Sequence, residues 1–264
     1  MIDWLLSPLS GLPTHDIAPL IAWHARAMVL AWGVIFPVAI LLARYWKIWP
    51  GQRWPQELDH KLWWHAHKYG QTFAVALMTL GVYLAWRARG AQWSPGLMIH
   101  ASLGWFLVLL GWMQLLGGWL RGSKGGPREP SMRGDHFDMT PRRRAFEWTH
   151  KLLGWLALSL AVLTVMLGLW LVDAPRWMLL SLTVWWAALV ALAWRWQLQA
   201  KCIDTYQAIW GLDPNLPGMK CPPIGWGIRR VKSPQTFKPK QAASRELSNT
   251  YPLKGDKHET SQLY

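Results

Sequence analysis

Long stretches of apolar residues with almost no charge recur along this chain, and they constrain its fold more than any other feature. The hydrocarbon core of a bilayer is about 30 Å thick, so a helix needs roughly 20 mostly apolar residues to cross it. Five stretches meet that length: Pro19 to Trp46, Leu62 to Trp86, Pro95 to Leu120, Ala145 to Val172, and Arg176 to Trp196. The sequence therefore predicts an all-α integral membrane bundle of five transmembrane helices.

Composition divides the chain into three parts. Residues 1–18 precede the first span, residues 19–200 hold the spans, and residues 201–264 are polar, basic and rich in proline and glycine. The first residues lack a basic start, an apolar run and a small-residue cleavage site, so we expect no cleaved signal peptide. The fifth stretch continues toward Trp210, and we expect its helix to extend past the membrane. Beyond Gly211 the prolines predict irregular structure, and residues 241–264 are expected to be disordered.

Lysine and arginine gather on one side of the predicted bundle. They follow the first span, lie between the third and fourth spans, and run through the tail, for example at Arg44, Arg121 and Arg143. The positive-inside rule then places the N-terminus in the periplasm and the tail in the cytoplasm of a bacterial inner membrane. The net charge of +14 indicates this orientation rather than nucleic-acid binding. Cys202 and Cys221 fall on the reducing side and are expected to be free thiols.

Histidines inside the spans need an explanation, because polar side chains are costly in lipid. Four of them, His24, His67, His100 and His150, lie on four different spans, each about one to two turns from the N-terminal end of its span. Consecutive spans run antiparallel. His24 and His100 therefore share one depth near the outer face, and His67 and His150 share one near the inner face, which predicts two facing pairs.

Two neutral imidazoles on facing helices can hold a haem iron from both sides, and apolar helix walls suit the porphyrin. The pattern predicts two non-covalent haem b groups in a core formed by the first four helices, since no Cys-x-x-Cys-His attachment motif occurs. The irons would lie on the order of 15–20 Å apart along the membrane normal. A single histidine in a span is more often a hydrogen-bonded packing residue, but four in matched pairs favour iron ligation.

The other five histidines are not expected to form a further facing pair. His65 lies two residues before His67 and points about 200° away from it on a helix, so only one of the two can face a given haem. The remaining four lie in connectors or tails and are expected at the surface: His15, His60, His136 and His258.

Further residues stand at fixed offsets from the four histidines. The first is followed by Trp32, Gly33, Pro37, Ala43, Arg44 and Tyr45; the second by Gln71; the third by Gly104, Gln114 and Arg121; and the fourth by Gly154 and Gly168. In these motifs, from Ile21 to Gly168, the chain resembles the cytochrome b561 family, in the five-helix form often found beside a DOMON domain. No such domain precedes the spans in this sequence.

The resemblance implies transmembrane electron transfer through two bis-histidine haems. His24 and His100 would bind the outer iron, and His67 and His150 the inner iron. Gln71 matches the family position four residues after the second ligand, which selects His67 over His65. The glycines are expected to let the porphyrin or a neighbouring helix approach closely.

Three classes of function fit these observations. The leading hypothesis is a membrane oxidoreductase or electron-transfer subunit that passes electrons between a quinol or small reductant and an acceptor on or across the membrane. The alternative is a haem-containing membrane anchor or assembly subunit, with a protein partner docked at the tail. A transporter with histidine proton relays would need acidic partners inside the spans, where only Glu147 and Asp173, near helix ends, come close. All three share the lipid bilayer as a partner.

Overall fold

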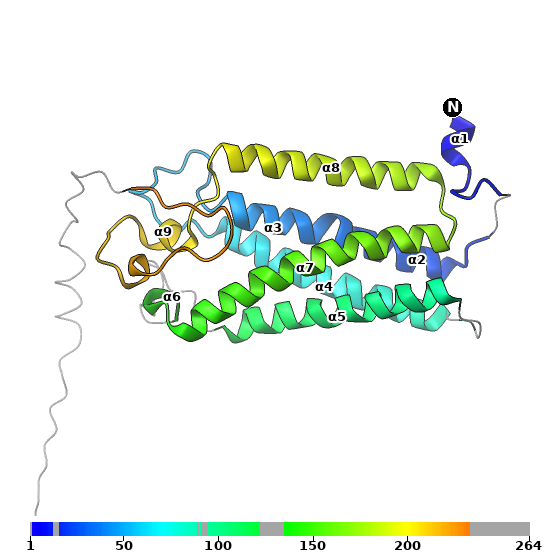
Figure 1. Cartoon of the computed structure of the whole chain (residues 1–264), viewed down its shortest axis with the longest axis horizontal. Coiled ribbons are helices and arrows are strands. Elements are labelled where there is room, and N and C mark those ends of the chain that lie inside the picture. The colour runs from blue at the N-terminus through cyan, green and yellow to red at the C-terminus, as the bar shows by residue number, and fades with distance from the viewer. Residues whose placement is uncertain (1, 13–15, 89, 91–93, 122–134, 233–264) are drawn as a thin grey trace, which may run out of the picture. The chain divides into compact units, whose positions relative to one another are not determined.

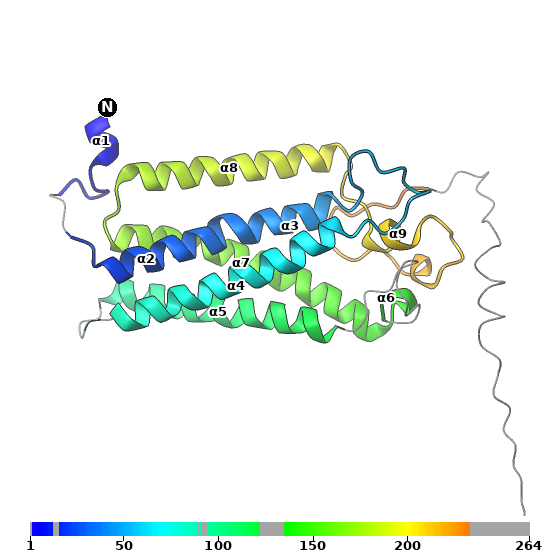
Figure 2. The same cartoon turned by 180° about the vertical axis from the view of Figure 1, so that it is seen from behind.

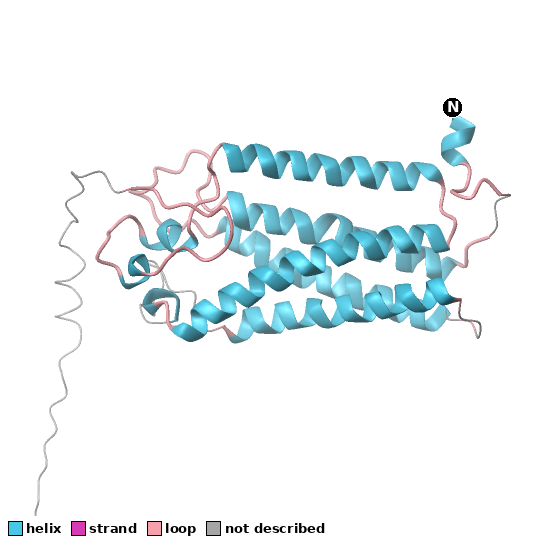
Figure 3. Ribbon diagram, viewed as in Figure 1, coloured by secondary structure: helices cyan, strands magenta, loops and turns pink. Residues whose placement is uncertain are grey.

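The computed structural model describes residues 2–12, 16–88, 90, 94–121 and 135–232, and all regular secondary structure among them is helical (Figure 3). The described residues up to Val231 form one compact unit. Residues 241–264, for which the sequence predicts disorder, lie outside the described residues, as do His15 and His258. The all-α class predicted from the sequence is confirmed.

Five long helices run back and forth along the described part of this unit (Figure 1). The first is continuous from Pro19 to Tyr45 and is built of α2 (Pro19–Met28), a π-helical segment η1 (Val29–Ile35) and α3 (Phe36–Tyr45). The others are α4 (Leu62–Ala88), α5 (Pro95–Leu120), α7 (Pro141–Leu171) and α8 (Arg176–Leu198). The short elements are α1 (Ile2–Leu6), α6 (Asp135–Asp138), α9 (Thr205–Trp210) and a 3₁₀ turn η2 (Pro217–Lys220).

Capping residues set where the helices begin. The Thr140 side chain accepts a hydrogen bond from the Arg143 N–H (3.3 Å), and Pro141 occupies the first helical position, where a missing N–H costs nothing. For this reason α7 begins at Pro141, about one turn before the expected Ala145. Ser94 caps α5 in the same way.

Among the described residues, four helices are long and apolar enough to cross a membrane: Pro19–Tyr45, α5, α7 and α8. The chain is therefore a multi-pass membrane protein. The second expected span, α4, is as long as the first at 27 residues, but it is not among these four, because its first turns carry the polar residues His65, Lys68 and Gln71.

The long helices pack in pairs. Helix α4 lies along α2 and α3, α5 lies along α7, and α8 packs on α3. Helix α8 has no buried residue, which fits its position at the edge of the bundle in Figures 1 and 2. The central core contains Trp32 and Phe36 of the first helix, Met78 of α4 and Leu110 of α5.

The expected extension of α8 toward Trp210 is wrong. Helix α8 ends at Leu198, and Ala200 adopts a φ of 59°, which a continuing α-helix does not allow. A separate helix, α9, starts behind Asp204, whose carboxylate accepts a hydrogen bond from the Tyr206 N–H (3.2 Å).

Residues 201–231, here called the C-terminal cap, are folded against the bundle rather than extended. Tyr206, Ile209 and Trp210 of α9 are buried in one cluster with Trp63 of α4. As the sequence predicts, the stretch beyond Gly211 is mostly irregular, with η2 as its one short helical turn among the described residues. Figures 1 and 2 both show α9 and α6 at the same end of the bundle, opposite α1.

Candidate functional site

The structure brings the four span histidines together as two facing pairs. His24 on α2 and His100 on α5 form the first, with ring centroids 6.2 Å apart and ring planes at 80°. His67 on α4 and His150 on α7 form the second, again at 6.2 Å, with planes at 76°. The pairing is the one predicted from matched depths. Whether these imidazoles ligate a metal stays a prediction.

Backbone carbonyls hold three of the four imidazoles in one orientation. The Nδ1 atoms of His24, His100 and His67 lie 2.8, 3.1 and 3.4 Å from the carbonyl oxygens of Gly81, Thr164 and Ala39, respectively. A carbonyl can only accept, so each Nδ1 carries the proton and each Nε2 keeps a free lone pair. This is the arrangement in which a histidine is ready to bind a metal through Nε2.

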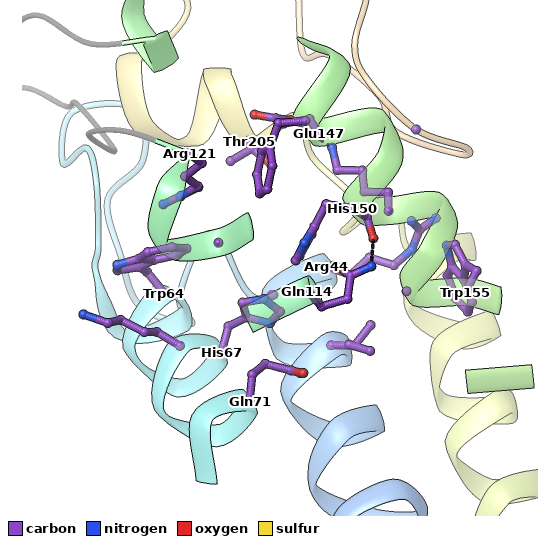
Figure 4. A pocket seen from close by; sticks show the side chains of 18 of the residues that line it. Arg44, Trp64, His67, Gln71, Gln114, Arg121, Glu147, His150, Trp155 and Thr205 are labelled. Atoms are coloured by element: carbon purple, nitrogen blue, oxygen red, sulfur yellow. Dashed lines mark hydrogen bonds and ion pairs between the residues drawn. The ribbon is translucent and has the colours of Figure 1, made fainter. Parts of the chain in front are cut away.

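The fourth histidine, His150, is hydrogen-bonded through its backbone carbonyl. The Gln114 side-chain amide donates to the His150 carbonyl oxygen (3.0 Å), which ties α5 to α7 beside the second pair. Among the described residues, the buried Nδ1 of His150 and the buried Oε1 of Gln114 have no hydrogen-bond partner. Figure 4 shows His67 and His150 pointing toward one another across a cavity, with Gln114 beside them.

Each pair lines a cavity of a size typical of ligand sites. The cavity between His24 and His100, here called the His24 cavity, holds about 350 Å³. The cavity between His67 and His150, the His67 cavity, holds about 800 Å³ and reaches the C-terminal cap at Cys202. Each pair supplies two nitrogens, so a metal between them would take its remaining ligands from a group bound in the cavity.

Glycines shape the walls of both cavities. A Cβ atom on Gly104, Gly118 or Gly154 would meet nothing within 4 Å, because these glycines face open cavity space. A Cβ atom on Gly168 would instead lie 2.9 Å from the Cε1 atom of His100. Gly168 therefore allows the His100 ring to lie against α7, and the other glycines leave flat walls.

The two cavities differ in charge. Six basic side chains and one acidic side chain, Glu147, line the His67 cavity. The basic residues are Arg44, Lys47, Lys68, Arg121, Arg143 and Lys151. Of the described residues that line the His24 cavity, none carries a formal charge other than what its two histidines can acquire.

Several of these charges are buried. Glu147 lies between Arg143 and Lys151, 3.1 Å from a nitrogen of each. Just beyond the end of α5, burial and then the nearby Arg143 lower the pKa of Arg121 to about 9. Just beyond α3, burial lowers the pKa of Lys47 to about 8, although its ammonium donates to the carbonyls of Arg44 and Ile203. Both groups remain mostly protonated at pH 7.

Three motif residues form hydrogen bonds between the first long helix and its neighbours. Gln71 donates to the Phe36 carbonyl (3.3 Å), which links α4 to α3. Arg44 donates to the Trp226 carbonyl (2.7 Å), which links α3 to the C-terminal cap. The Gly33 carbonyl accepts hydrogen bonds from two indoles of α8. These contacts give Gln71, Gly33 and Arg44 positioning roles that their sequence offsets do not reveal.

The remaining histidines lie outside both pairs. His65 is exposed and stacks on Tyr69, with ring planes 8° apart. His60, expected at the surface, is partly buried and stacks on Trp49, so that expectation is wrong. The side chain of His136 lies outside the described residues. The sequence singles out Arg44 and Arg121 as motif residues and Arg143 as a topology signal, but it does not predict that six basic residues line one cavity.

The chain is distantly similar to two curated plant proteins. It is 27% identical over 156 residues to a cytochrome b561, DM13 and DOMON domain-containing protein of Arabidopsis thaliana, a match that covers 59% of this chain and 15% of the relative. It is 28% identical over 156 residues to a cytochrome b561 and DOMON domain-containing protein of the same plant, covering 57% of this chain and 31% of the relative. The chain thus spans less than a third of each relative.

The similarity confirms the resemblance drawn from the motifs. No family model matches the chain. No solved structure matches it either.

Proposed function

We propose that this chain moves electrons across a membrane through two haem b groups, one between His24 and His100 and one between His67 and His150. The observation that carries the proposal is the presence of two facing imidazole pairs in one bundle, each lining its own cavity. An iron bound by two imidazoles in a haem changes its oxidation state by one electron, and this is the chemistry that the group supplies. The distant similarity to cytochrome b561 domain proteins supports the same function.

The described residues fit such a group. Three imidazoles keep an Nε2 lone pair available to a metal because their Nδ1 atoms face carbonyl oxygens. Gly104, Gly118 and Gly154 leave flat walls beside the pairs, as a planar macrocycle requires. The basic lining of the His67 cavity suits the carboxylates that haem carries at one edge.

Packed side chains lie between the two cavities. Trp32 lines the His24 cavity and Phe36 lines the His67 cavity, and their ring centroids are 4.3 Å apart. Met78 and Gly111 pack tightly in the same layer, since a Cβ atom on Gly111 would lie 2.9 Å from the Met78 Cε atom. These residues exclude water between the pairs and hold the two sites at a fixed separation.

We extend the proposal to topology. Helix α4 is long enough to span and packs along α2 and α3, so it crosses the membrane with them and brings the number of spans to five. The positive-inside rule then places the C-terminal cap in the cytoplasm of a bacterial inner membrane. A quinol or small reductant would donate the electrons, and the acceptor would lie on or across the membrane. A protein partner would dock at the cytoplasmic tail.

A haem count on single variants tests this function. The protein is purified in detergent, and dithionite-reduced minus oxidised spectra are recorded with a pyridine haemochrome assay. We expect two haem b per chain in the wild type, one in His67→Ala, and two in the matched control His65→Ala, whose imidazole stacks on Tyr69 at the surface. Absence of haem from the wild type, or equal loss in both variants, would overturn the proposal.

A further inference from the structure

The two histidine pairs share geometry and differ in electrostatic surroundings. Their ring separations are equal and both cavities have mainly apolar walls. Positive charge, however, gathers at the His67 cavity, while the described lining of the His24 cavity has no lysine, arginine, aspartate or glutamate. Figure 4 shows Arg44, Arg121 and Glu147 around the His67–His150 pair. A redox group at each pair would therefore experience a different field.

From this asymmetry we infer that the buried basic residues make the His67–His150 site the electron-accepting end of the chain, with a midpoint potential more positive than that of the His24–His100 site. The inference rests on the proposed function. In this assignment Lys47, Arg121 and Arg143 act on the redox group at the His67–His150 site through their positive charge. The inference also gives a direction: electrons that enter at the His24 end move downhill to the His67 end.

The sign follows from simple electrostatics. Reduction of a haem iron removes one positive charge from the site, so nearby cations favour the reduced state. Burial matters because a charge in the low-dielectric interior is screened much less than one in water. Arg143 is 2% exposed and Lys47 is 5% exposed, so their fields reach the cavity largely unscreened. The apolar walls shift the midpoint potentials of both sites in the same direction, so they do not produce the difference between the two sites.

Negative charge at the His67 cavity does not cancel the effect. Glu147 is the one acidic residue among the described lining, and Arg143 and Lys151 both contact it. Asp204 of the C-terminal cap is engaged by Arg230 at 2.6 Å. The two carboxylates of a bound haem would compensate two further cations. Even if the exposed Lys68 is discounted, basic residues still outnumber acidic groups at this cavity.

An equilibrium redox titration of the purified two-haem protein, followed by absorbance, tests the inference. Two waves are expected in the wild type. The variants Lys47→Met and Arg121→Gln each remove one lining cation, and both lie more than two residues from any proposed ligand. We expect each variant to shift the more positive of the two waves to a more negative potential. The other wave should stay at its wild-type potential.

Matched controls separate this effect from a general change in charge or folding. Arg53→Gln removes an arginine from the connector that also holds Lys47. The Arg53 side chain is 82% exposed and does not line the cavity, so neither wave should move. A haem count of two per chain shows that each variant is folded and loaded. Movement of the more negative wave, equal movement of both waves, or no movement in either lining variant would overturn the inference. A wild type without two haems would instead overturn the proposed function.

Discussion

Trp32 and Phe36 lie one turn apart on the first long helix with ring centroids 4.3 Å apart, and each ring lines a different histidine cavity. Both side chains are buried, at 7% and 5% exposure. The layer that separates the two candidate redox sites therefore contains a continuous aromatic contact. This contact lies within the helix that carries His24, so the same element positions a ligand and fills the space between the sites.

Replacing Trp32 tests the importance of that layer. Trp32→Ala should cost about 3–5 kcal/mol of stability, because it leaves a cavity that the surrounding side chains cannot fill. It should also slow electron equilibration between the sites while both haems remain bound, measured by flash photoreduction and transient absorbance. Trp32→Phe keeps a ring against Phe36 and should lose much less on both measures. Equal behaviour of the two variants would contradict this role.

Gly168 should be needed for the His24–His100 site. A Cβ atom there would lie 2.9 Å from the His100 ring, so Gly168→Ala should displace the imidazole at a cost of about 1–3 kcal/mol. We expect weaker haem retention at this site alone, measured as loss of one haem per chain during dilution in detergent. Gly117→Ala is the control, since its Cβ atom would make an ordinary 3.5 Å contact with Phe146. Retention of both haems in Gly168→Ala would contradict the prediction.

The hydrogen bonds to the Gly33 carbonyl should stabilise the attachment of α8. In a regular helix this carbonyl would accept from the N–H of residue 37, which is a proline and has none. Trp185 and Trp186 donate instead, at 2.9 and 3.1 Å. Each Trp→Phe variant should cost about 1 kcal/mol, and the double variant more than twice that, because the carbonyl is then left unsatisfied.

Thermal unfolding in detergent measures these differences. Trp194→Phe serves as the control, because Trp194 lies on the same helix and is 66% exposed. The prediction would be contradicted if each single variant lost no more stability than Trp194→Phe and if the loss in the double variant equalled the sum of the two single losses. Other contacts would then hold α8.

Lys47 should make the stability depend on pH. Its pKa is about 8 in the folded chain against an ordinary value of 10.5, because burial disfavours the ammonium. The folded state therefore binds this proton more weakly than the unfolded state, and wild-type stability should rise as the pH increases from about 8 to 10.5. The gain would be on the order of 1–3 kcal/mol.

A comparison with Lys47→Met isolates that contribution. The difference in Tm, wild type minus variant, should become more positive between pH 7 and pH 9.5, since methionine does not titrate. Lys201→Met removes an exposed lysine nearby and should show no such trend. A difference that is constant or falls with pH would mean that Lys47 does not carry a lowered pKa.

Local sequence rules predicted much of this architecture. A span needs about 20 apolar residues, and consecutive spans alternate in direction, so the depth of each histidine could be read from its distance to the helix start. That reasoning paired His24 with His100 and His67 with His150, and the structure places those rings together. The alternatives His65 and His67 differ by about 200° around a helix, and the structure puts His65 at the surface.

The sequence by itself determined the helical class, the approximate spans and the pairing of the histidines, because periodicity and length act along the chain. Tertiary structure alone decided which carbonyls orient the imidazoles, that the residues after α8 fold back as a cap, and that two indoles satisfy Gly33. It also gathered Lys47, Arg121 and Arg143 around one cavity. These features depend on contacts between residues far apart in the chain, and spacing along one helix carries no information about them.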